Sequence, residues 1–367
     1  MRDSTDINGI GSAVDAHLRQ HAGHGLKYYL LLWSLFFLIC FGLGYPTLNR
    51  YDPRQTEGLT DTIIYHQMVA GAQQSQRPRA DVFSGRILIP YVAKPFYYLA
   101  QSTLKTWEPA SFGLLVANSI FCATAALFLV GAGLSLTKDL SVALLGATLY
   151  LLNFAVPNLQ MAGLVDSGEA CFMLVVTWSL LTGRWWLLPL CGVGGALAKE
   201  TFMPFSALFA LVWWATAERH SQSRFRRLSY VIAMIISSSM TIMVVHLALH
   251  GHLVLPWNIA AAMYAPPNRL MSLLRCLTDR GFWYVFIWLL PLGAWHWKRL
   301  PRPWRLSSLL TALLALAFGA YNGMAGTVAR PIFNIAGPML CLSVAMLLTN
   351  SARLDMLKEE RAVPPST

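Results

Sequence analysis

Charged residues are scarce in this sequence. They make up 12% of the 367 residues, whereas hydrophobic residues make up 56%. A soluble domain usually carries about 25% charged residues, so this composition excludes an ordinary soluble protein. Apolar runs long enough to cross a hydrocarbon core of about 30 Å recur along almost the whole chain, and no stretch has the composition of a separate soluble domain. The sequence therefore predicts one all-α, polytopic membrane domain.

The chain also lacks the short motifs of several common enzyme classes. No GxxxxGKS/T, GxSxG, HExxH or CxxC pattern is present, which argues against an ATPase, an ordinary serine hydrolase and the common zinc enzymes. The six cysteines lie mostly in apolar runs without the paired spacing of a disulfide framework or a zinc site, so we expect them to be packing residues. In such a chain the net charge of +11 reports orientation and contact with lipid phosphates, and does not indicate nucleic acid.

Membrane topology follows from two short loops, 218–227 and 298–305, that each hold four lysines or arginines. The positive-inside rule places both loops in the cytoplasm. The apolar run 87–104 contains two prolines, a lysine and an aromatic cluster, so we expect an interfacial or re-entrant helix there. About ten transmembrane helices remain: 28–48, 110–136, 140–157, 167–183, 185–198, 201–217, 228–249, 281–297, 306–324 and 327–349.

The same topology divides the chain into three parts. Residues 1–27 form a cytoplasmic N-terminal segment, 28–349 the transmembrane domain and 350–367 a cytoplasmic tail. The first external loop, 49–109, is expected to consist of amphipathic interfacial helices, because exposed irregular backbone is not tolerated in lipid. We expect an integral protein of a bacterial inner or plasma membrane, with its polar features on the outer face.

The first candidate site residues lie in the external stretch GLTDTIIYHQMVAG, residues 58–71. Helical spacing places Glu57, Asp61 and Tyr65 on one face at i, i+4 and i+8. A carboxylate held at a dry boundary is a stronger base and can accept a proton from a hydroxyl nucleophile, which makes Asp61 a candidate catalytic residue. Alternatively, Asp61 caps its helix or pairs with a nearby arginine.

Two later stretches place further charges at membrane depth. Asp166 and Glu169 share a helical face at the start of one apolar run, although Asp166 could simply be a helix cap. Lys199 and Glu200 stand between two runs that are too close for a solvated loop. Lysine is a compact cation that can bind phosphate oxygens, with Glu200 orienting it, and the alternative is a turn whose charges reach back to the interface.

The remaining candidates are two arginines and a group of histidines. Arg86 in RILIP and Arg330 in ARPIFN could bind phosphate, or could anchor their helices among lipid headgroups. The three histidines have metal-like H-x-x-x-H-x-H spacing but lack an acidic partner nearby in sequence, so we favour an interfacial role for them. They are His246, His250 and His252.

Together these motifs resemble the GT-C superfamily of integral-membrane glycosyltransferases, which includes protein O-mannosyltransferases and lipid A aminoarabinose transferases. The resemblance is carried by Asp61 and Tyr65 in the first external loop, by Arg86, Leu88 and Pro90 as R-x-L-x-P, by Asp166 at the start of an outward-facing span, by the A-x-x-K-E turn 196–200 and by Arg330 in the last external loop. The motifs are short and are spread over most of the chain.

The resemblance implies a cell-envelope glycan enzyme that uses a polyprenyl-phosphate-linked sugar as donor, transfers the sugar with inversion on the extracytoplasmic face, and acts on a glycan, lipid or protein acceptor. Asp61 would be the general base and Asp166 a second acid, with Lys199 and Arg330 near the donor phosphate. No other cofactor is implied, and a divalent metal stays open. Two rival functions are a polysaccharide polymerase or ligase that uses lipid-pyrophosphate-linked glycans, and a lipid or solute transporter, which the lack of a clear inverted repeat disfavours.

Overall fold

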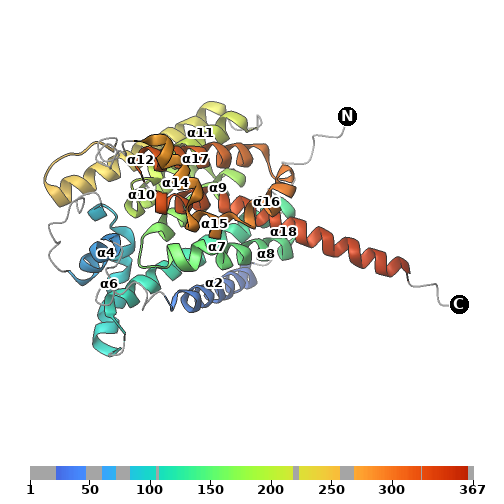
Figure 1. Ribbon diagram of the computed structural model, residues 1–367, viewed down its shortest axis with the longest axis horizontal. Coiled ribbons are helices and arrows are strands. Elements are labelled where there is room, and N and C mark those ends of the chain that lie inside the picture. Colours follow the sequence, from blue (N-terminus) through green and yellow to red (C-terminus); the bar gives the residue numbers. More distant parts are fainter. Residues whose placement is uncertain are drawn as a thin grey trace.

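The computed structural model describes residues 22–46, 60–71, 83–104, 107–217, 223–256, 268–323 and 325–362. Regular structure in those ranges is helical throughout, which confirms the predicted all-α class (Figure 1). The helices are α2 (Ala22–Gly44), α4 (Thr60–Ala70), α6 (Leu88–Thr103), α7 (Pro109–Thr137), α8 (Leu140–Leu152), α9 (Asp166–Leu181), α10 (Leu188–Ala198), α11 (Phe202–Thr216), α12 (Arg224–His250), α14 (Arg269–Thr278), α15 (Arg280–Phe286), α16 (Leu289–His296), α17 (Arg302–Tyr321) and α18 (Ala329–Ala362). Four short helical turns join them: η1 (Val156–Gln160), η2 (Trp185–Leu187), η3 (Trp297–Arg299) and η4 (Ala325–Thr327).

Five helices of the described chain are long and apolar enough to cross a membrane, which supports the membrane class. They are Gly25–Gly44, Pro109–Thr137, Arg224–His250, Arg302–Tyr321 and Ala329–Asn350. A helix of 20 residues is about 30 Å long and so matches the hydrocarbon core. Three further apolar helices are shorter than this: Leu140–Leu152, Trp185–Ala198 and Phe202–Thr216. The number of ten spans therefore stays a prediction.

Two of the predicted spans are interrupted. In the run 140–157, α8 ends before Asn153, whose side-chain amide donates a hydrogen bond to the carbonyl of Val285 at 3.0 Å. The run 281–297 divides into α15 and α16, which two residues separate. The helix also ends for local reasons, since Oδ1 of Asn153 accepts from the N–H of Ala155 at 2.9 Å and Pro157 has no N–H to donate to the carbonyl of Asn153.

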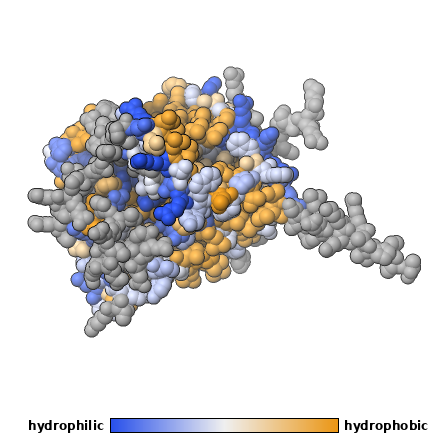
Figure 2. All heavy atoms as spheres, viewed as in Figure 1, coloured by the Kyte–Doolittle hydropathy of each residue, from blue (hydrophilic) through white to orange (hydrophobic). Residues whose placement is uncertain are grey.

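The surface and interior of the bundle differ as expected for a protein in lipid. Helices α7 and α18 lie largely inside, whereas α2 lies at the periphery and exposes a series of leucines. Hydrophobic residues cover much of the face seen in Figure 2. All six cysteines are free and buried, which confirms that they are packing residues.

The predicted helix at 87–104 is present as α6, and it packs along α7. Its outer surface combines exposed Tyr91, Tyr98 and Leu99 with Lys94, whose ammonium lies 4.1 Å from the centre of the Tyr91 ring. This mixture of aromatic rings and a cation is typical of a membrane interface. The helix is confirmed, and its place relative to the membrane stays a prediction.

The bundle has two distinct ends. At one end, α11 finishes beside the start of α12, where the indole of Trp214 donates to the carbonyl of Arg224 at 3.0 Å. At the other end, α11 begins beside the end of α17, and the rings of Phe205 and Phe318 lie 6.2 Å apart. Because α17 has 20 residues, about 30 Å of helix separates the basic turn before Arg302 from the opposite end. That opposite end carries the candidate site.

Candidate functional site

A small core positions the first-loop helix α4 against the bundle. It contains Tyr65 and Val69 of α4, together with buried residues of α6, of α7 and of the turn that precedes α9. In that turn Gly163 has a φ of +72°, a conformation that other residues rarely adopt. A Cβ on Gly163 would lie 3.2 Å from the methyl group of Thr62, so this glycine also lets α4 pack closely. The turn thereby brings Asp61 near the start of α9.

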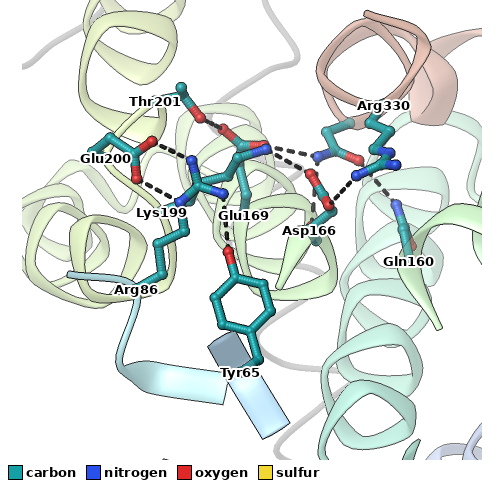
Figure 3. A network of polar contacts seen from close by, with 10 residues as sticks. Tyr65, Arg86, Gln160, Asp166, Glu169, Lys199, Glu200, Thr201 and Arg330 are labelled. Atoms are coloured by element: carbon teal, nitrogen blue, oxygen red, sulfur yellow. Dashed lines mark hydrogen bonds and ion pairs between the residues drawn. The ribbon is translucent and has the colours of Figure 1, made fainter. Parts of the chain in front are cut away.

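Lys199 ends α10 in an extended conformation and extends its side chain toward α9. Its Nζ lies 2.6 Å from Oδ1 of Asp166 and 3.5 Å from Oε2 of Glu169 (Figure 3). Thr201 donates to Oε1 of Glu169 at 2.6 Å, and the amide of Asn334 donates to Oε2 at 3.0 Å. The predicted shared face of Asp166 and Glu169 is confirmed, since both carboxylates meet one lysine.

A second cation reaches the same carboxylate from α18. Nη1 of Arg330 lies 3.4 Å from Oδ2 of Asp166, so Asp166 is placed between Lys199 and Arg330. The Nε of Arg330 is buried and has no hydrogen-bond partner among the residues that the structure describes. A buried, unsatisfied guanidinium N–H is costly, which makes it a candidate donor to a ligand.

The sequence suggested that Glu200 orients Lys199, but the carboxylate of Glu200 contacts a different cation. Its carboxylate forms a bidentate pair with Arg86, in which Nε donates to Oε2 at 2.8 Å and Nη2 donates to Oε1 at 2.5 Å. The remaining Nη1 of Arg86 donates to the hydroxyl of Tyr65 at 3.0 Å. The correction has a simple geometric reason: adjacent residues in a turn point apart, so Lys199 faces α9 while Glu200 faces Arg86 before α6 (Figure 3).

Burial and neighbouring charges shift the pKa values of Glu200 and Lys199 in opposite directions. Burial alone would raise the pKa of Glu200, but the adjacent Arg86 outweighs it and holds this pKa below its ordinary value. Burial would lower the pKa of Lys199, but Asp166 and Glu169 raise it above its ordinary value. Tyr65 is fully buried and its pKa is raised by desolvation, so the phenol keeps its proton. Since its oxygen accepts from Arg86, its own hydrogen is available to a ligand.

A cavity of about 360 Å³ opens among these residues. Six of the predicted site residues line it: Asp61, Tyr65, Arg86, Asp166, Lys199 and Arg330. The carboxylates of Glu169 and Glu200 hold the lining cations, and Glu57 lies outside the described residues. The rest of the lining is mainly apolar and includes Phe205, Phe318 and Val328. The expected convergence of charges from distant segments is thus confirmed.

The charges around the cavity nearly balance. Three cations, Arg86, Lys199 and Arg330, face the three acids that they pair with, Asp166, Glu169 and Glu200. Asp61 adds one further negative charge. Within the part of the chain that the structure describes, it forms no hydrogen bond or ion pair, and it is half-buried at the cavity wall. Asp61 is therefore the one carboxylate of this group that is available to accept a proton.

Sequence reasoning missed the amides and hydroxyl that complete the network. Gln160 donates to Asn334 at 2.9 Å, and Asn334 and Thr201 both hold Glu169. Asn334 follows Arg330 by four residues in an apolar helix, so its polarity at that spacing was an available signal. Gln160 lies in the π-helical turn η1, whose geometry could not be read from local sequence.

The three histidines lie near the site, beside the segment that precedes α6. Nε2 of His250 is 3.0 Å from the hydroxyl of Ser84, and the His246 and His250 rings are 5.4 Å apart. Among the residues that the structure describes, no group of three histidines, cysteines or acids is arranged to hold a metal ion.

No protein-family model matches the chain, and no curated protein sequence matches it. The resemblance to GT-C glycosyltransferases therefore stays a prediction from the motifs.

Proposed function

We propose that this protein is an integral-membrane glycosyltransferase that moves one sugar from a polyprenyl-phosphate donor to an acceptor hydroxyl. The observation that carries the proposal is one cavity in which Asp61, a carboxylate that no described residue pairs with, shares a wall with the cations Lys199 and Arg330. Such a cavity offers a base for the nucleophile and positive charge for the departing phosphate, which are the two needs of the reaction.

In this mechanism Asp61 removes the proton from the acceptor hydroxyl. The oxygen then forms a bond to the anomeric carbon on the face opposite the donor phosphate, and the bond from that carbon to the phosphate oxygen breaks with inversion. Asp166 is a poor base because it is ion-paired with both Lys199 and Arg330. We assign it the role of positioning these two cations for the leaving phosphate.

The charge balance favours a monophosphate over a pyrophosphate donor. The three cations are already matched by three acids, so the site has no large surplus of positive charge. The donor capacity that remains at Arg330 Nε suits one phosphodiester, which carries a single negative charge. The apolar wall of Phe205, Phe318 and Val328 suits the lipid end of the donor or the apolar face of a sugar.

The basic end of the bundle supports an outward-facing site. Arg224, Arg226 and Arg302 lie at helix starts at the end away from the cavity. If positive residues mark the cytoplasmic side, the cavity opens toward the extracytoplasmic face. A lipid-linked donor and a cell-envelope acceptor would meet there.

The proposal is tested with purified protein in detergent, without any transmembrane gradient. The protein is incubated with a membrane extract as acceptor source and with either a polyprenyl phosphate carrying one radiolabelled hexose or a polyprenyl-pyrophosphate-linked oligosaccharide. We expect single-sugar transfer from the first donor alone. Chain elongation from the second donor would favour the polymerase or ligase function, and absence of transfer from both donors would overturn the proposal.

Arg330→Lys is expected to lower kcat/KM for the donor by about tenfold. Lysine keeps the positive charge but removes the buried Nε donor, and one hydrogen bond to a charged group contributes about 1.5 kcal/mol. Initial rates at varied donor concentration give this ratio. The matched control is Arg184→Lys, because Arg184 is exposed and stacks on Trp178 outside the site; equal effects of the two substitutions would contradict the role of Arg330.

Sidedness can be tested with cysteines at the two ends of α12. Arg226 and Leu253 are exposed, and the 27 residues of this helix make it about 40 Å long. In intact cells, we expect Leu253→Cys to react with a membrane-impermeant maleimide and Arg226→Cys to react only after the membrane is opened. The native thiols are buried and provide little background. The reverse labelling pattern would place the cavity on the cytoplasmic side.

A further inference from the structure

Helix α14 presents an apolar face that no described part of the protein covers. Its inner side chains, Ser272 and Cys276, are buried, and Cys276 belongs to the main core. Its outward side chains are exposed and apolar, with Leu270 68% accessible. The exposed set is Leu270, Met271, Leu274 and Leu277. At 3.6 residues per turn these four residues occupy an arc of about 120° on one side of the helix.

Basic residues accompany this apolar face. Arg275 and Arg280 are exposed, and the guanidinium of Arg269 lies 4.4 Å from the centre of the Tyr321 ring. The nearby acid, Asp279, uses its carboxylate to accept a hydrogen bond from the backbone N–H of Phe282 at 3.1 Å. The helix therefore combines leucines with a surplus of positive charge, which complements an anionic lipid surface.

The location of α14 ties it to the site end of the bundle. It packs against α17 and η4, which carry the cavity residues Gly319 and Thr327. Asp279 is both the C-cap of α14 and the N-cap of α15, and its extended backbone separates the two helices. An exposed Arg275 does not suit the hydrocarbon core, and an exposed leucine face does not suit water. The interface between the hydrocarbon core and water accommodates both the arginine and the leucine face.

We infer that α14 is a membrane-surface helix. Leu270, Met271, Leu274 and Leu277 enter the outer boundary of the bilayer, while Arg275 and Arg280 bind anionic phospholipid headgroups. Because α14 borders the cavity wall, this contact sets the mouth of the cavity at headgroup level. The inference stands on the surface of α14 and does not require sugar transfer.

Fluorescence quenching in vesicles tests the depth of α14. Leu274→Cys, Arg275→Cys and the reference Leu313→Cys, an exposed position in the middle of α17, are labelled with bimane and reconstituted in phosphatidylethanolamine and phosphatidylglycerol. Quenchers are iodide in water and nitroxide lipids labelled near the headgroup or near the chain end. We expect the Leu274 probe to lie about 5–10 Å below the headgroups and to be quenched most by the shallow nitroxide. The Arg275 probe should respond to iodide and the Leu313 probe to the deep nitroxide.

Two results would overturn the inference: strong iodide quenching of the Leu274 probe, as for water-exposed α14, or deep-nitroxide quenching equal to that of Leu313, as for a helix in the hydrocarbon core. The headgroup contact is tested by replacing phosphatidylglycerol with phosphatidylcholine. We expect shallow quenching of the Leu274 probe to fall in the neutral lipid, and expect Arg275→Gln with Arg280→Gln to remove this lipid dependence. Equal quenching in both lipids would exclude binding of anionic headgroups. Unsubstituted protein carried through labelling reports any reaction of the buried thiols.

Discussion

Asp61→Asn is expected to lower the rate of sugar transfer by about 10²–10⁴-fold, the usual contribution of a general base. Asn has the size of Asp but cannot accept the proton. Asp61 forms no hydrogen bond or ion pair with any residue that the structure describes, so the substitution should leave the fold unchanged. Transfer rates at saturating donor, together with the thermal unfolding midpoint in detergent, separate the two effects.

The matched control for this experiment is Asp139→Asn. Asp139 caps α8, where its carboxylate accepts from the N–H groups of Ser141 and Val142. Asn caps helices about as well as Asp, so both stability and transfer should stay at the level of the unsubstituted protein. Full turnover by the purified Asp61→Asn protein would show that another group is the base. A large loss in the Asp139→Asn protein would show that the assay responds to general damage.

Arg86→Met is expected to lower the free energy of unfolding by about 3–5 kcal/mol, because it leaves a buried carboxylate without its partner. Arg86 is 5% exposed and its guanidinium donates to both oxygens of Glu200 and to the hydroxyl of Tyr65. The loss should also separate α4 from the turn between α10 and α11. Denaturant titration in mixed micelles gives the change, with the exposed Arg184→Met as control.

The double variant Arg86→Met with Glu200→Met distinguishes a lost pair from an unpaired charge. Removing both members of a buried pair is often nearly neutral, so we expect the double variant to recover most of the stability lost in Arg86→Met. Sugar transfer should be low in both variants, because Tyr65 loses the hydrogen bond that it accepts from Arg86 at the cavity wall. Additive destabilisation by the two substitutions would show that Arg86 and Glu200 act independently.

The fold was predictable where hydrophobicity is local information. Long apolar runs correctly indicated helices such as α7, α12 and α17, since every backbone group in lipid must be satisfied within its own segment. The break at Asn153 has a local signal in Pro157, which cannot donate to the carbonyl four residues earlier, whereas the contact of the Asn153 side chain with the carbonyl of Val285 was not predictable. The amphipathic helix α14 is not among the predicted helices, because its ten residues include two arginines and are too few for an apolar run that crosses a membrane.

The sequence indicated which charged residues belong to the site, but it did not indicate which of them form ion pairs with one another. Charges are expensive in an apolar chain, so Asp61, Asp166, Lys199 and Arg330 were conspicuous in sequence. Their partners depend on how the side chains point after the helices pack. The sequence favoured the adjacent Lys199 and Glu200 as a pair. In the structure Lys199 contacts the carboxylate of Asp166, and Glu200 contacts the guanidinium of Arg86.

Sequence alone determined that this chain is helical, that it is built for a membrane, and which ionisable residues such a chain would retain at cost. Tertiary structure decided which cation each of the paired carboxylates meets, and it placed Asp61 at the cavity wall without a partner among the described residues. The division has a physical cause: burial of apolar surface is summed along each segment, whereas an ion pair needs two groups from distant segments within about 4 Å.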